Sequence, residues 1–312
     1  MKRVKVSIDL GNSMLKAVTY VNGKAVKAKL PNRMQVSKTI SPKARKMEVG
    51  GKVLYLGVGD LNNNILKHTR QNLLEQVLVM VNELYPDENK LGVELATGLP
   101  PVQLFNDMYL KEFQDLFADK GVIKFSINGI DKEVEITSIE VYAEGYSGFV
   151  SIVDELKTKQ DILSIDVGGG TTDLCNYQFD YEDNMYYPDV TDTIETGVID
   201  FAEEIANKFN NAHGADIKAM QIDHILKNNL DVIEYEGKEY ELANYMPTIE
   251  NTVNNMINKI TNKFGTLSKY AIVGIGGGYK TFERIAKEKI SKSIELDSET
   301  QFYANALGYL EQ

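Results

Sequence analysis

The sequence predicts an α/β protein made of two related domains. One observation is an internal repeat: Ser7-Ile8-Asp9-Leu10-Gly11 returns, about half a chain later, as Ser164-Ile165-Asp166-Val167-Gly168. A second is that strand-like and helix-like segments alternate along the chain. A third is the length of 312 residues, which is enough for about two domains.

The first half is expected to begin with a meander of three strands. After the strand that ends near Asp9, residues 14–21 read as a strand, Asn22-Gly23 is typical of a type I′ hairpin turn, and residues 24–30 form the third strand. The elements expected next are helices over 70–85, from Pro100 to about 118 and over 143–157, and strands over 91–97, 122–127 and 133–141.

The second half is expected to begin in the same way. Residues 172–179 and 185–190 read as strands joined by a turn at 180–184. The shared continuation after the repeated motif favours duplication over chance. The elements expected next are helices over 200–211, 216–228, 242–264 and 299–311, and a short buried strand over 270–275.

The domains are expected to follow this duplication. The first domain should comprise residues 1–143 and 291–312, with an insertion at about 31–88. The second should comprise residues 144–290, with an insertion at about 212–258 that contains the hairpin turn Glu236-Gly237-Lys238.

Composition and charge restrict the classes of function. The chain has 34 Lys and Arg against 45 Asp and Glu, a net charge of −11, so direct DNA binding is disfavoured and any action on DNA would need a basic adaptor. Its three histidines lack the spacing of metal ligands, and its one cysteine, Cys175, points to a reducing compartment. No long apolar run or leader pattern is seen, so we expect a cytoplasmic protein without a membrane segment.

The repeated motif has the chemistry of a nucleotide site. Asp9 and Asp166 each end a buried strand just before a glycine turn, and across a cleft the two carboxylates would share one hydrated Mg²⁺. Backbone N–H groups in tight glycine turns bind phosphates. The residues expected to clasp the phosphates are Gly11, Asn12 and Ser13 on one side and Gly168, Gly169, Gly170, Thr171 and Thr172 on the other.

Lys16 lies on the strand that leaves the first turn, where it would reach a phosphate oxygen. Taken singly, Asp and Gly after a strand are typical of a plain turn, and Lys16 would be a solvated strand residue. The chain has neither the GxxxxGK[ST] motif of a P-loop nor a GxGxxG dinucleotide motif. The nucleotide interpretation depends on the combination of two matched turns with a later glycine loop.

Three segments together resemble the actin and sugar-kinase superfamily. The segment from Asp9 to Lys16 resembles its first phosphate motif, and the segment from Asp166 to Asp173 resembles its second. Residues 272–278, ending in Gly276, Gly277 and Gly278, are similar to its adenosine motif. The resemblance implies an actin-like (ribonuclease H-like) duplicated two-domain fold around a central nucleotide cleft.

Within that superfamily, the chain is most similar to the ParM/StbA-type bacterial actin-like plasmid-segregation ATPases. Residues 96–101, which contain Gly98-Leu99-Pro100, resemble their Gly-Leu-Pro segment. Residues 302–309, which contain Asn305-Ala306 and Gly308, resemble their terminal Asn-Ala-x-Gly helix.

The resemblance also implies residue roles. Glu144 falls at the position of the family's catalytic glutamate, although the usual flanking proline is absent, and Asp9 and Asp166 would act with it through the metal. Asp173 would bond within the Thr171–Thr172 loop or face a metal-bound water. Glu204 and Lys208 would contact the ribose. Each of these residues also has an alternative interpretation without a role toward the nucleotide. Glu144 would only complement the dipole at the start of a helix, and Glu204 and Lys208 would form a surface ion pair.

The function that the resemblance implies is an ATP-hydrolysing, Mg²⁺-dependent bacterial protein, with GTP left open. Its subunits would polymerise into dynamic cytoplasmic filaments and segregate plasmid DNA through a DNA-binding adaptor. One alternative is a small-molecule kinase or phosphatase of the same superfamily, although no acceptor-binding segment is evident. Others are a chaperone-type protein, for which the chain has no spare length, and a cell-shape actin homologue, which would be expected to have a membrane-binding terminus.

Overall fold

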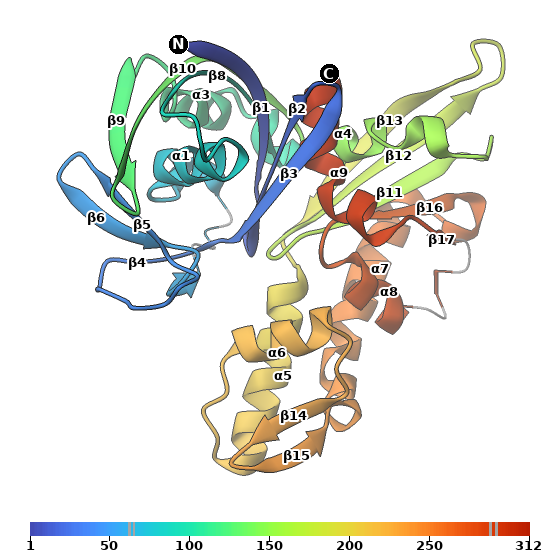
Figure 1. Cartoon of the computed structure of the whole chain (residues 1–312). Coiled ribbons are helices and arrows are strands. Elements are labelled where there is room, and N and C mark those ends of the chain that lie inside the picture. Colours follow the sequence, from blue (N-terminus) through green and yellow to red (C-terminus); the bar gives the residue numbers. More distant parts are fainter. Residues whose placement is uncertain (62–63, 65, 287–288, 291–292) are drawn as a thin grey trace. The chain divides into compact units, whose positions relative to one another are not determined.

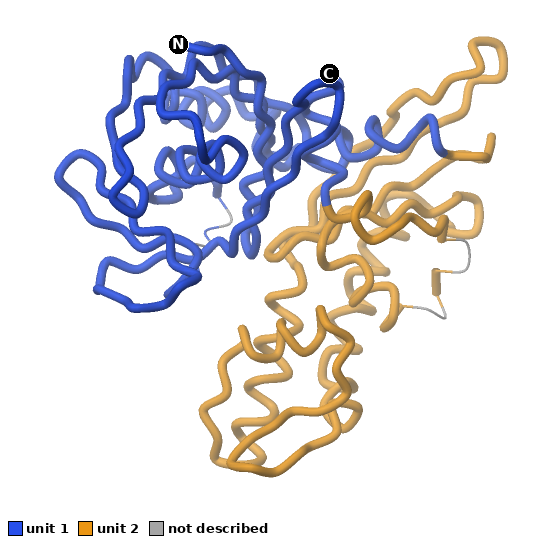
Figure 2. Tube along the Cα trace, viewed as in Figure 1, with its two compact units in different colours: residues 1–155, 303–312 blue, residues 156–302 orange. Residues whose placement is uncertain are grey.

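The computed structural model describes residues 1–61, 64, 66–286, 289–290 and 293–312. Its chain divides into two compact units (Figures 1 and 2). Unit 1 comprises residues 1–155 and 303–312, and unit 2 comprises residues 156–302. Each unit has its own buried hydrophobic core, so each meets the basic requirement of a domain.

Unit 1 is built on one mixed sheet. The meander β1 (Lys2–Leu10), β2 (Met14–Val21) and β3 (Lys24–Pro31) is antiparallel, and β8 (Lys90–Leu99) joins β1 in parallel. The sheet continues in the order β10 (Ile130–Ala143), β9 (Val122–Ile127), β5 (Arg45–Val49), β6 (Lys52–Leu56), β4 (Arg33–Gln35) and β7 (Asp60–Leu61).

The helices of unit 1 are short except for two. Helix α1 (Leu73–Leu84) packs against β1, β2 and β3, and its run from Val77 to Val81 is buried on every side, as expected of a helix inside a core. The C-terminal helix α9 (Ser298–Glu311) begins in unit 2 and ends in unit 1. The others are the 3₁₀ turns η1 (Lys67–Thr69) and η2 (Val153–Glu155) and the helices α2 (Pro101–Leu104), α3 (Asp107–Asp115) and α4 (Tyr146–Val150).

Unit 2 repeats the beginning of unit 1. Its meander is β11 (Ile162–Val167), β12 (Thr172–Asp180) and β13 (Met185–Ile194), and β16 (Ala271–Ile275) joins β11 in parallel, as β8 joins β1. The register is also repeated, because Asp9 pairs with Lys16 and Asp166 pairs with Asp173. The duplication inferred from the repeated motif is therefore confirmed. A short strand β17 (Ser293–Ile294) adds to β16.

Helices of unit 2 cover its sheet and pack against one another, and the insertion expected at about 212–258 stays a prediction. Helix α5 (Val198–His213) buries one face, formed by Phe201, Ile205 and Phe209, and packs against α6 (Ala219–Lys227). The hairpin of β14 (Val232–Tyr235) and β15 (Lys238–Glu241) confirms the turn expected at Glu236-Gly237. The remaining elements are η3 (Leu242–Asn244), η4 (Met246–Ile249), α7 (Glu250–Phe264), η5 (Leu267–Lys269) and α8 (Tyr279–Ala286).

Three expected helices differ from the structure. The helix expected up to residue 118 breaks between α2 and α3, because the Asn106 side chain accepts hydrogen bonds from the amides of Met108 and Tyr109 and starts a new helix. The helix expected over 242–264 becomes two 3₁₀ turns before α7, with Pro247 in the second of them. The helix expected over 143–157 is reduced to α4 and η2.

The boundaries of the compact units also lie later in the chain than the domain boundaries expected at 143 and 290. Residues 144–155 belong to unit 1, where α4 contacts the C-terminal part of α9 through Asn305. The second unit extends to Phe302, beyond its expected end at residue 290, and residue 291, where the first domain is expected to resume, lies outside the described residues.

Cys175 lies in the core of unit 2. Its side chain on β12 is 1% exposed, and burial raises the pKa of the thiol to about 11. A buried thiol with a raised pKa forms little thiolate, so we expect Cys175 to be unreactive. Among the described residues, no helix is both long enough and apolar enough to cross a membrane.

Two glycines of β8 provide a matched test of packing in unit 1. A Cβ atom added at Gly98 would lie 2.1 Å from the Tyr309 hydroxyl and 2.4 Å from the ring, whereas at Gly92 the nearest atom is Arg3 Cγ at 3.4 Å. We expect Gly98→Ala to lower the free energy of unfolding by about 1–3 kcal/mol, the usual cost of overpacking a core. Gly92→Ala should stay within about 0.5 kcal/mol of the wild type. Equal values in denaturant titrations would contradict this packing.

Candidate functional site

The candidate site of unit 1 is built around a buried ion pair at the end of β1. Asp9 and Lys16 are opposite each other on β1 and β2, and Lys16 Nζ donates to Asp9 Oδ2 at 2.7 Å. Their side chains are 5% and 9% exposed. Lys16 therefore contacts the carboxylate, in addition to any role toward a phosphate.

Burial and neighbouring charges compete to set the pKa of Asp9. Burial, the largest influence, acts to raise it, since a carboxylate is poorly solvated inside a protein. The charges of Lys16 and then Lys67, the hydrogen bond from Lys16 and the charge of Arg70 together outweigh burial. They hold the pKa of Asp9 below its ordinary value, so the carboxylate is ionised at neutral pH.

The turn after Asp9 is fixed by hydrogen bonds to Asn32, which is fully buried. The Asn32 side chain donates to the carbonyl of Gly11 at 2.7 Å and of Asn12 at 3.2 Å, and its backbone N–H donates to the carbonyl of Ser13 at 3.0 Å. Gln76 of α1 donates to Asn32 Oδ1 at 2.7 Å and fixes the side chain. The predicted phosphate turn is thus a rigid loop whose carbonyls point inward to Asn32.

Two further cations come from η1 and from Arg70, the residue directly after it, neither of which sequence reasoning singled out. Lys67 and Arg70 are three residues apart, and in a 3₁₀ turn such side chains point the same way. Arg70 donates to the Leu10 carbonyl at 2.7 Å, to the Asn64 carbonyl at 2.6 Å and to Asn12 Oδ1. Burial lowers its pKa to about 10, which leaves it charged at neutral pH.

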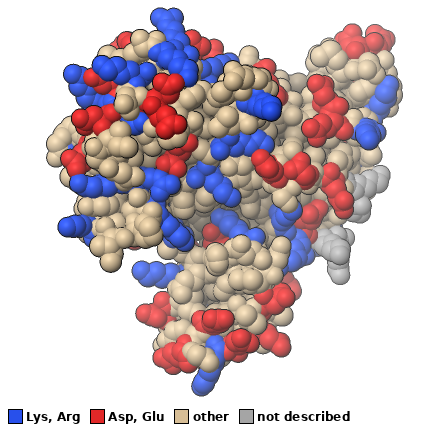
Figure 3. All heavy atoms as spheres, in the orientation of Figure 1, with Lys and Arg blue, Asp and Glu red and all other residues tan. Residues whose placement is uncertain are grey.

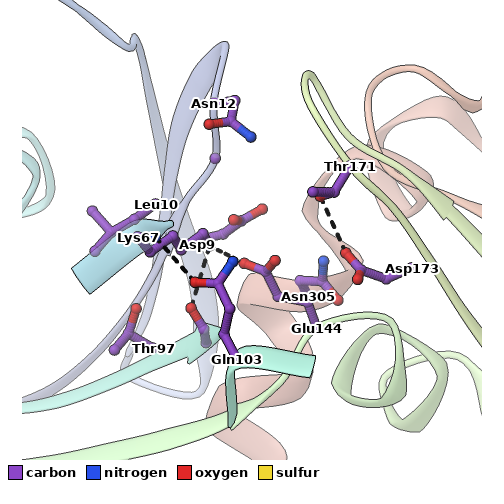
Figure 4. Close-up of polar contacts among 12 residues, drawn as sticks. Asp9, Leu10, Asn12, Lys67, Thr97, Gln103, Glu144, Thr171, Asp173 and Asn305 are labelled. Carbon is purple, nitrogen blue, oxygen red and sulfur yellow. Dashed lines mark hydrogen bonds and ion pairs between the residues drawn. The ribbon is translucent and has the colours of Figure 1, made fainter. Parts of the chain in front are cut away.

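Glu144, the predicted catalytic residue, lies in the same cluster. Its carboxylate is 8% exposed and forms an ion pair with Lys67 Nζ, which also donates to the Gly98 carbonyl at 3.2 Å. Gln103 Oε1 accepts the Lys67 backbone N–H at 3.0 Å and ties η1 to α2 (Figure 4). Glu144 is therefore a buried carboxylate held by Lys67, whose charge also acts on Asp9.

Lys16, Lys67 and Arg70 face two carboxylates, so this part of unit 1 carries one excess positive charge. The whole chain, by contrast, has a net charge of −11. Excess positive charge in a buried setting favours an anionic ligand, because charges interact strongly where water is excluded. The cluster can attract phosphate and can hold an acidic group in a fixed position.

Unit 2 has a candidate site of its own at the turn after β11. Gly168 N–H donates to the Thr171 carbonyl at 2.8 Å and closes the turn. The first residues of α5 lie directly on it, because Val198 and Ile199 donate to the carbonyls of Gly168 and Gly169 at 3.1 and 2.9 Å. The first N–H groups of α5 are therefore used within the protein and fix the turn against the helix.

The threonines and Asp173 brace this turn. Thr172 Oγ1 donates to the Thr196 carbonyl at 2.8 Å. Asp173 accepts hydrogen bonds from Thr193 Oγ1 at 2.7 Å and from Thr171 Oγ1 at 3.4 Å (Figure 4). The bond from Thr171 is the first of the two contacts considered for Asp173, and a role toward a metal-bound water stays a prediction.

The glycine loop after β16 lies against Asp166. Gly276 has φ of +82°, and a Cβ atom there would lie 2.3 Å from Asp166 Oδ1. Gly278 N–H donates to the Val167 carbonyl at 2.9 Å, and Gly276 N–H donates to the Gln301 carbonyl at 3.1 Å. Two motifs about a hundred residues apart in the sequence are thus brought together within unit 2. At Gly277, an added Cβ would meet only the Phe302 ring, at 3.5 Å.

The residues suggested for ribose contact lie on α5. Glu204 is half-buried and accepts a hydrogen bond from Thr252 Oγ1 of α7 at 2.6 Å, while Lys208 is exposed one turn further along. Glu204 is thus tied to α7, and the surface ion pair considered for Glu204 and Lys208 is not the contact that its carboxylate makes. Their role toward a sugar stays a prediction.

The donor set fits hydrated Mg²⁺ better than a tightly ligated metal. Within the described parts of the chain, no group of three or more His, Cys, Asp or Glu side chains is arranged to hold a metal ion. Mg²⁺ keeps several of its waters and is bound by one or two carboxylates together with phosphates. Asp9 and Asp166, each buried at the end of a strand, are carboxylates of this kind.

Two family models match the chain. The model of the N-terminal domain of actin-like proteins matches residues 7–146, and the model of the C-terminal part of archaeal MreB-like actin homologues matches residues 164–288. The first begins at the first Asp-Gly turn and ends just after Glu144. The second covers the other turn and the glycine loop. No curated protein sequence matches the chain.

The fold is similar to solved structures over almost the whole chain. The archaeal actin homologue Ta0583 has a TM-score of 0.77 at 20% identity, covering 99% of this chain and 98% of that one. The ParM of a 15-stranded filament from Clostridium botulinum has a TM-score of 0.78 at 18% identity, covering 100% and 99%. Bacillus thuringiensis ParM with ATP has a TM-score of 0.64 at 13% identity, covering 100% and 98%. The expected actin-like fold is confirmed.

The Asp9–Lys16 pair predicts a specific dependence of stability on pH. Because the pKa of Asp9 is lowered by folding, its ionised form stabilises the protein above about pH 3.9, the ordinary value. This contribution is lost as the pH falls through the lower pKa of the folded state. In Lys16→Met, the charge and the hydrogen bond that counteract the effect of burial on Asp9 are lost, so the pKa of Asp9 rises.

We therefore expect Lys16→Met to unfold more easily than the wild type at pH 7, with a deficit that shrinks as the pH falls below about 4. Denaturant titrations at pH 7, 5, 4 and 3 measure this. Lys24→Met, on the exposed end of β3, is the control and should show little deficit at any pH. A Lys16→Met deficit that is constant over this range would exclude the ion pair as its cause.

Proposed function

Because this chain belongs to the actin-like proteins, we propose that it binds and hydrolyses ATP with Mg²⁺ and polymerises into dynamic filaments. The observation that carries the proposal is the buried cluster at the end of β1, where Glu144 and Asp9 lie among Lys16, Lys67 and Arg70. The matched turn of unit 2 supports it, with Asp166 between a phosphate-type turn and a glycine loop. Similar folds have been solved with ADP and with ATP.

The proposal assigns separate roles to the residues that bind the phosphates, the nucleoside, the metal ion and the attacking water. Gly11, Asn12 and Ser13, and in unit 2 residues 168–172, bind the phosphates, while Gly276 to Gly278 lie along the nucleoside. Asp9 and Asp166 would hold Mg²⁺ through its waters, and the ion would supply positive charge to the phosphates. Glu144, fixed by Lys67, orients the attacking water and takes up its proton.

Filament formation and DNA segregation are the further parts of the proposal. Similar folds include a ParM filament and an Alp12 filament, which supports assembly of this chain with copies of itself. On the face in view, Asp and Glu side chains are interspersed with Lys and Arg over both units (Figure 3). With a net charge of −11, the filament would act on plasmid DNA in the cytoplasm through a basic adaptor.

Light scattering with ATP, GTP and ADP, followed by microscopy, tests the assembly. Nucleotide-dependent filaments are the expected result. A monomer under all conditions that transfers phosphate to a metabolite would instead identify the small-molecule kinase.

Glu144→Gln separates hydrolysis from binding. Gln keeps a hydrogen-bond acceptor for Lys67 but removes the base, so phosphate release should fall roughly 10²–10⁴-fold, the usual range for a general base. Nucleotide affinity should be unchanged, and filaments should form and persist, because the step that loosens them is slowed. Phosphate release and light scattering on one sample measure both effects. Normal phosphate release from this variant would exclude Glu144 as the catalytic base.

Substitutions of Gly277 test the proposed nucleoside contact and should change the stability of the fold little. Because a Cβ atom at this position meets only the Phe302 ring at ordinary distance, Gly277→Ala and Gly277→Val should fold. ATP affinity should fall with side-chain size, by about tenfold or more for Val if the overpacking cost of ~1–3 kcal/mol falls on the ligand. Gly276→Ala is the contrast, since its positive φ and the contact with Asp166 should lower stability itself. Unchanged affinity in a folded Gly277→Val would refute the assignment.

A further inference from the structure

The chain direction changes sharply immediately after Glu144. Gly145 has φ of +74° and ψ of −51°, a conformation that L side chains rarely adopt, and it forms the N-cap of α4. The N-cap residue normally supplies a side-chain oxygen to the free N–H groups of the first helical turn. Glycine has none, so α4 needs an acceptor from elsewhere in the protein.

Asn305 of the C-terminal helix supplies that acceptor. Its side-chain oxygen Oδ1 accepts the N–H of Gly145 at 3.0 Å and the N–H of Gly148 at 3.1 Å. Asn305 is 5% exposed and lies beside Glu144 (Figure 4). The cap of α4 therefore comes from a residue about 160 positions away in the sequence.

The distance between α9 and α4 allows little adjustment. A Cβ atom on Gly308 would lie 1.7 Å from the Ser147 carbonyl oxygen, so the two backbones are in direct contact. Ser7 Oγ donates to the Ala306 carbonyl and anchors the same turn of α9 to β1. The Asn-Ala-x-Gly segment is thus a docking element, and Asn305 is its polar contact with the residues that follow Glu144.

We propose that Asn305 is a positioning residue for Glu144: its side-chain oxygen holds the Gly145 corner and thereby the direction of the Glu144 carboxylate. The inference rests on the proposed function, since it assumes that Glu144 orients the attacking water. Asn305 acts through Gly145 and Gly148 and does not touch the reacting atoms.

The backbone of Glu144 shows why the corner controls its side chain. Its N–H donates to the Leu99 carbonyl and its carbonyl accepts from Tyr146, both at 2.9 Å, so its position depends on the residues on either side. Lys67 holds the far end of the side chain. Without Asn305, two buried N–H groups lose their acceptor and the corner must move to regain one. Misplacement of a catalytic group by 1 Å can cost about 10²-fold in rate.

The experiment compares Asn305→Ala with Asn305→Asp. Aspartate keeps an oxygen acceptor, and its negative charge is favoured at a helix N-terminus. We expect Asn305→Ala to lower kcat for ATP hydrolysis roughly 10–10²-fold with unchanged ATP affinity, and Asn305→Asp to restore most of it. Ser7→Ala is the matched control, because it removes another buried hydrogen bond of α9 without touching the Gly145 corner. Its kcat should equal that of the wild type.

A double-mutant cycle separates positioning from general loosening. In the Glu144→Gln background, Asn305→Ala should cause no further loss of kcat, because the group that it positions no longer acts as a base. A further loss as large as in the wild-type background would overturn the proposal. So would an Asn305→Asp protein that is as slow as Asn305→Ala.

Should Asn305→Ala fail to fold in thermal unfolding, Asn305→Ser, whose shorter hydroxyl cannot replace both contacts, takes its place with the same expected loss. The wild type and Glu144→Gln distinguish the two levels of failure. No phosphate release by the wild type, or normal release by Glu144→Gln, refutes the proposed function and the inference together. A slow Glu144→Gln with a fast Asn305→Ala and Asn305→Ser refutes the inference alone.

Discussion

Unit 1 depends on burying five charged groups next to one another. A charge taken from water destabilises a protein unless an opposite charge or hydrogen bonds compensate for it. Asp9 obtains Lys16 from the adjacent strand, and Glu144 obtains Lys67 from η1. The positions of β2, the segment from Lys67 to Arg70 and the β10–α4 corner are therefore linked, because each carries at least one member of the cluster. The three cations exceed the two carboxylates by one positive charge, which a phosphate ligand would neutralise.

The two Asp-Gly turns could be predicted because each is specified by a few consecutive residues. Aspartate at the end of an apolar strand followed by glycine specifies both the strand end and the turn, and the same pattern occurs twice. The glycine run after β16 likewise marks a place where the backbone can approach its neighbours closely, although it does not identify Asp166 and Val167 as those neighbours. These features need only a few consecutive residues, so they can be read without knowledge of the tertiary structure.

The residues that hold the site could not be found in this way. Asn32, Lys67, Arg70 and Asn305 act over long separations in the sequence, and a lone Asn or Lys in a loop has no distinguishing pattern. The spacing of Lys67 and Arg70 becomes informative only once η1 is known to be a 3₁₀ turn. The predicted helix lengths were wrong for a related reason. Side-chain caps such as Asn106 and Asn305 set where a helix starts, even where the apolar periodicity of the sequence continues.

The inert cysteine in the core of unit 2 makes the natural chain a ready background for site-specific thiol chemistry. Maleimides react with thiolates, and Cys175, the single cysteine, is buried with a raised pKa and stays a thiol. A cysteine introduced by Ile40→Cys, where the side chain is 98% exposed between β4 and β5, would be the one labelled position. A fluorophore there would report on subunit exchange without the removal of any native residue.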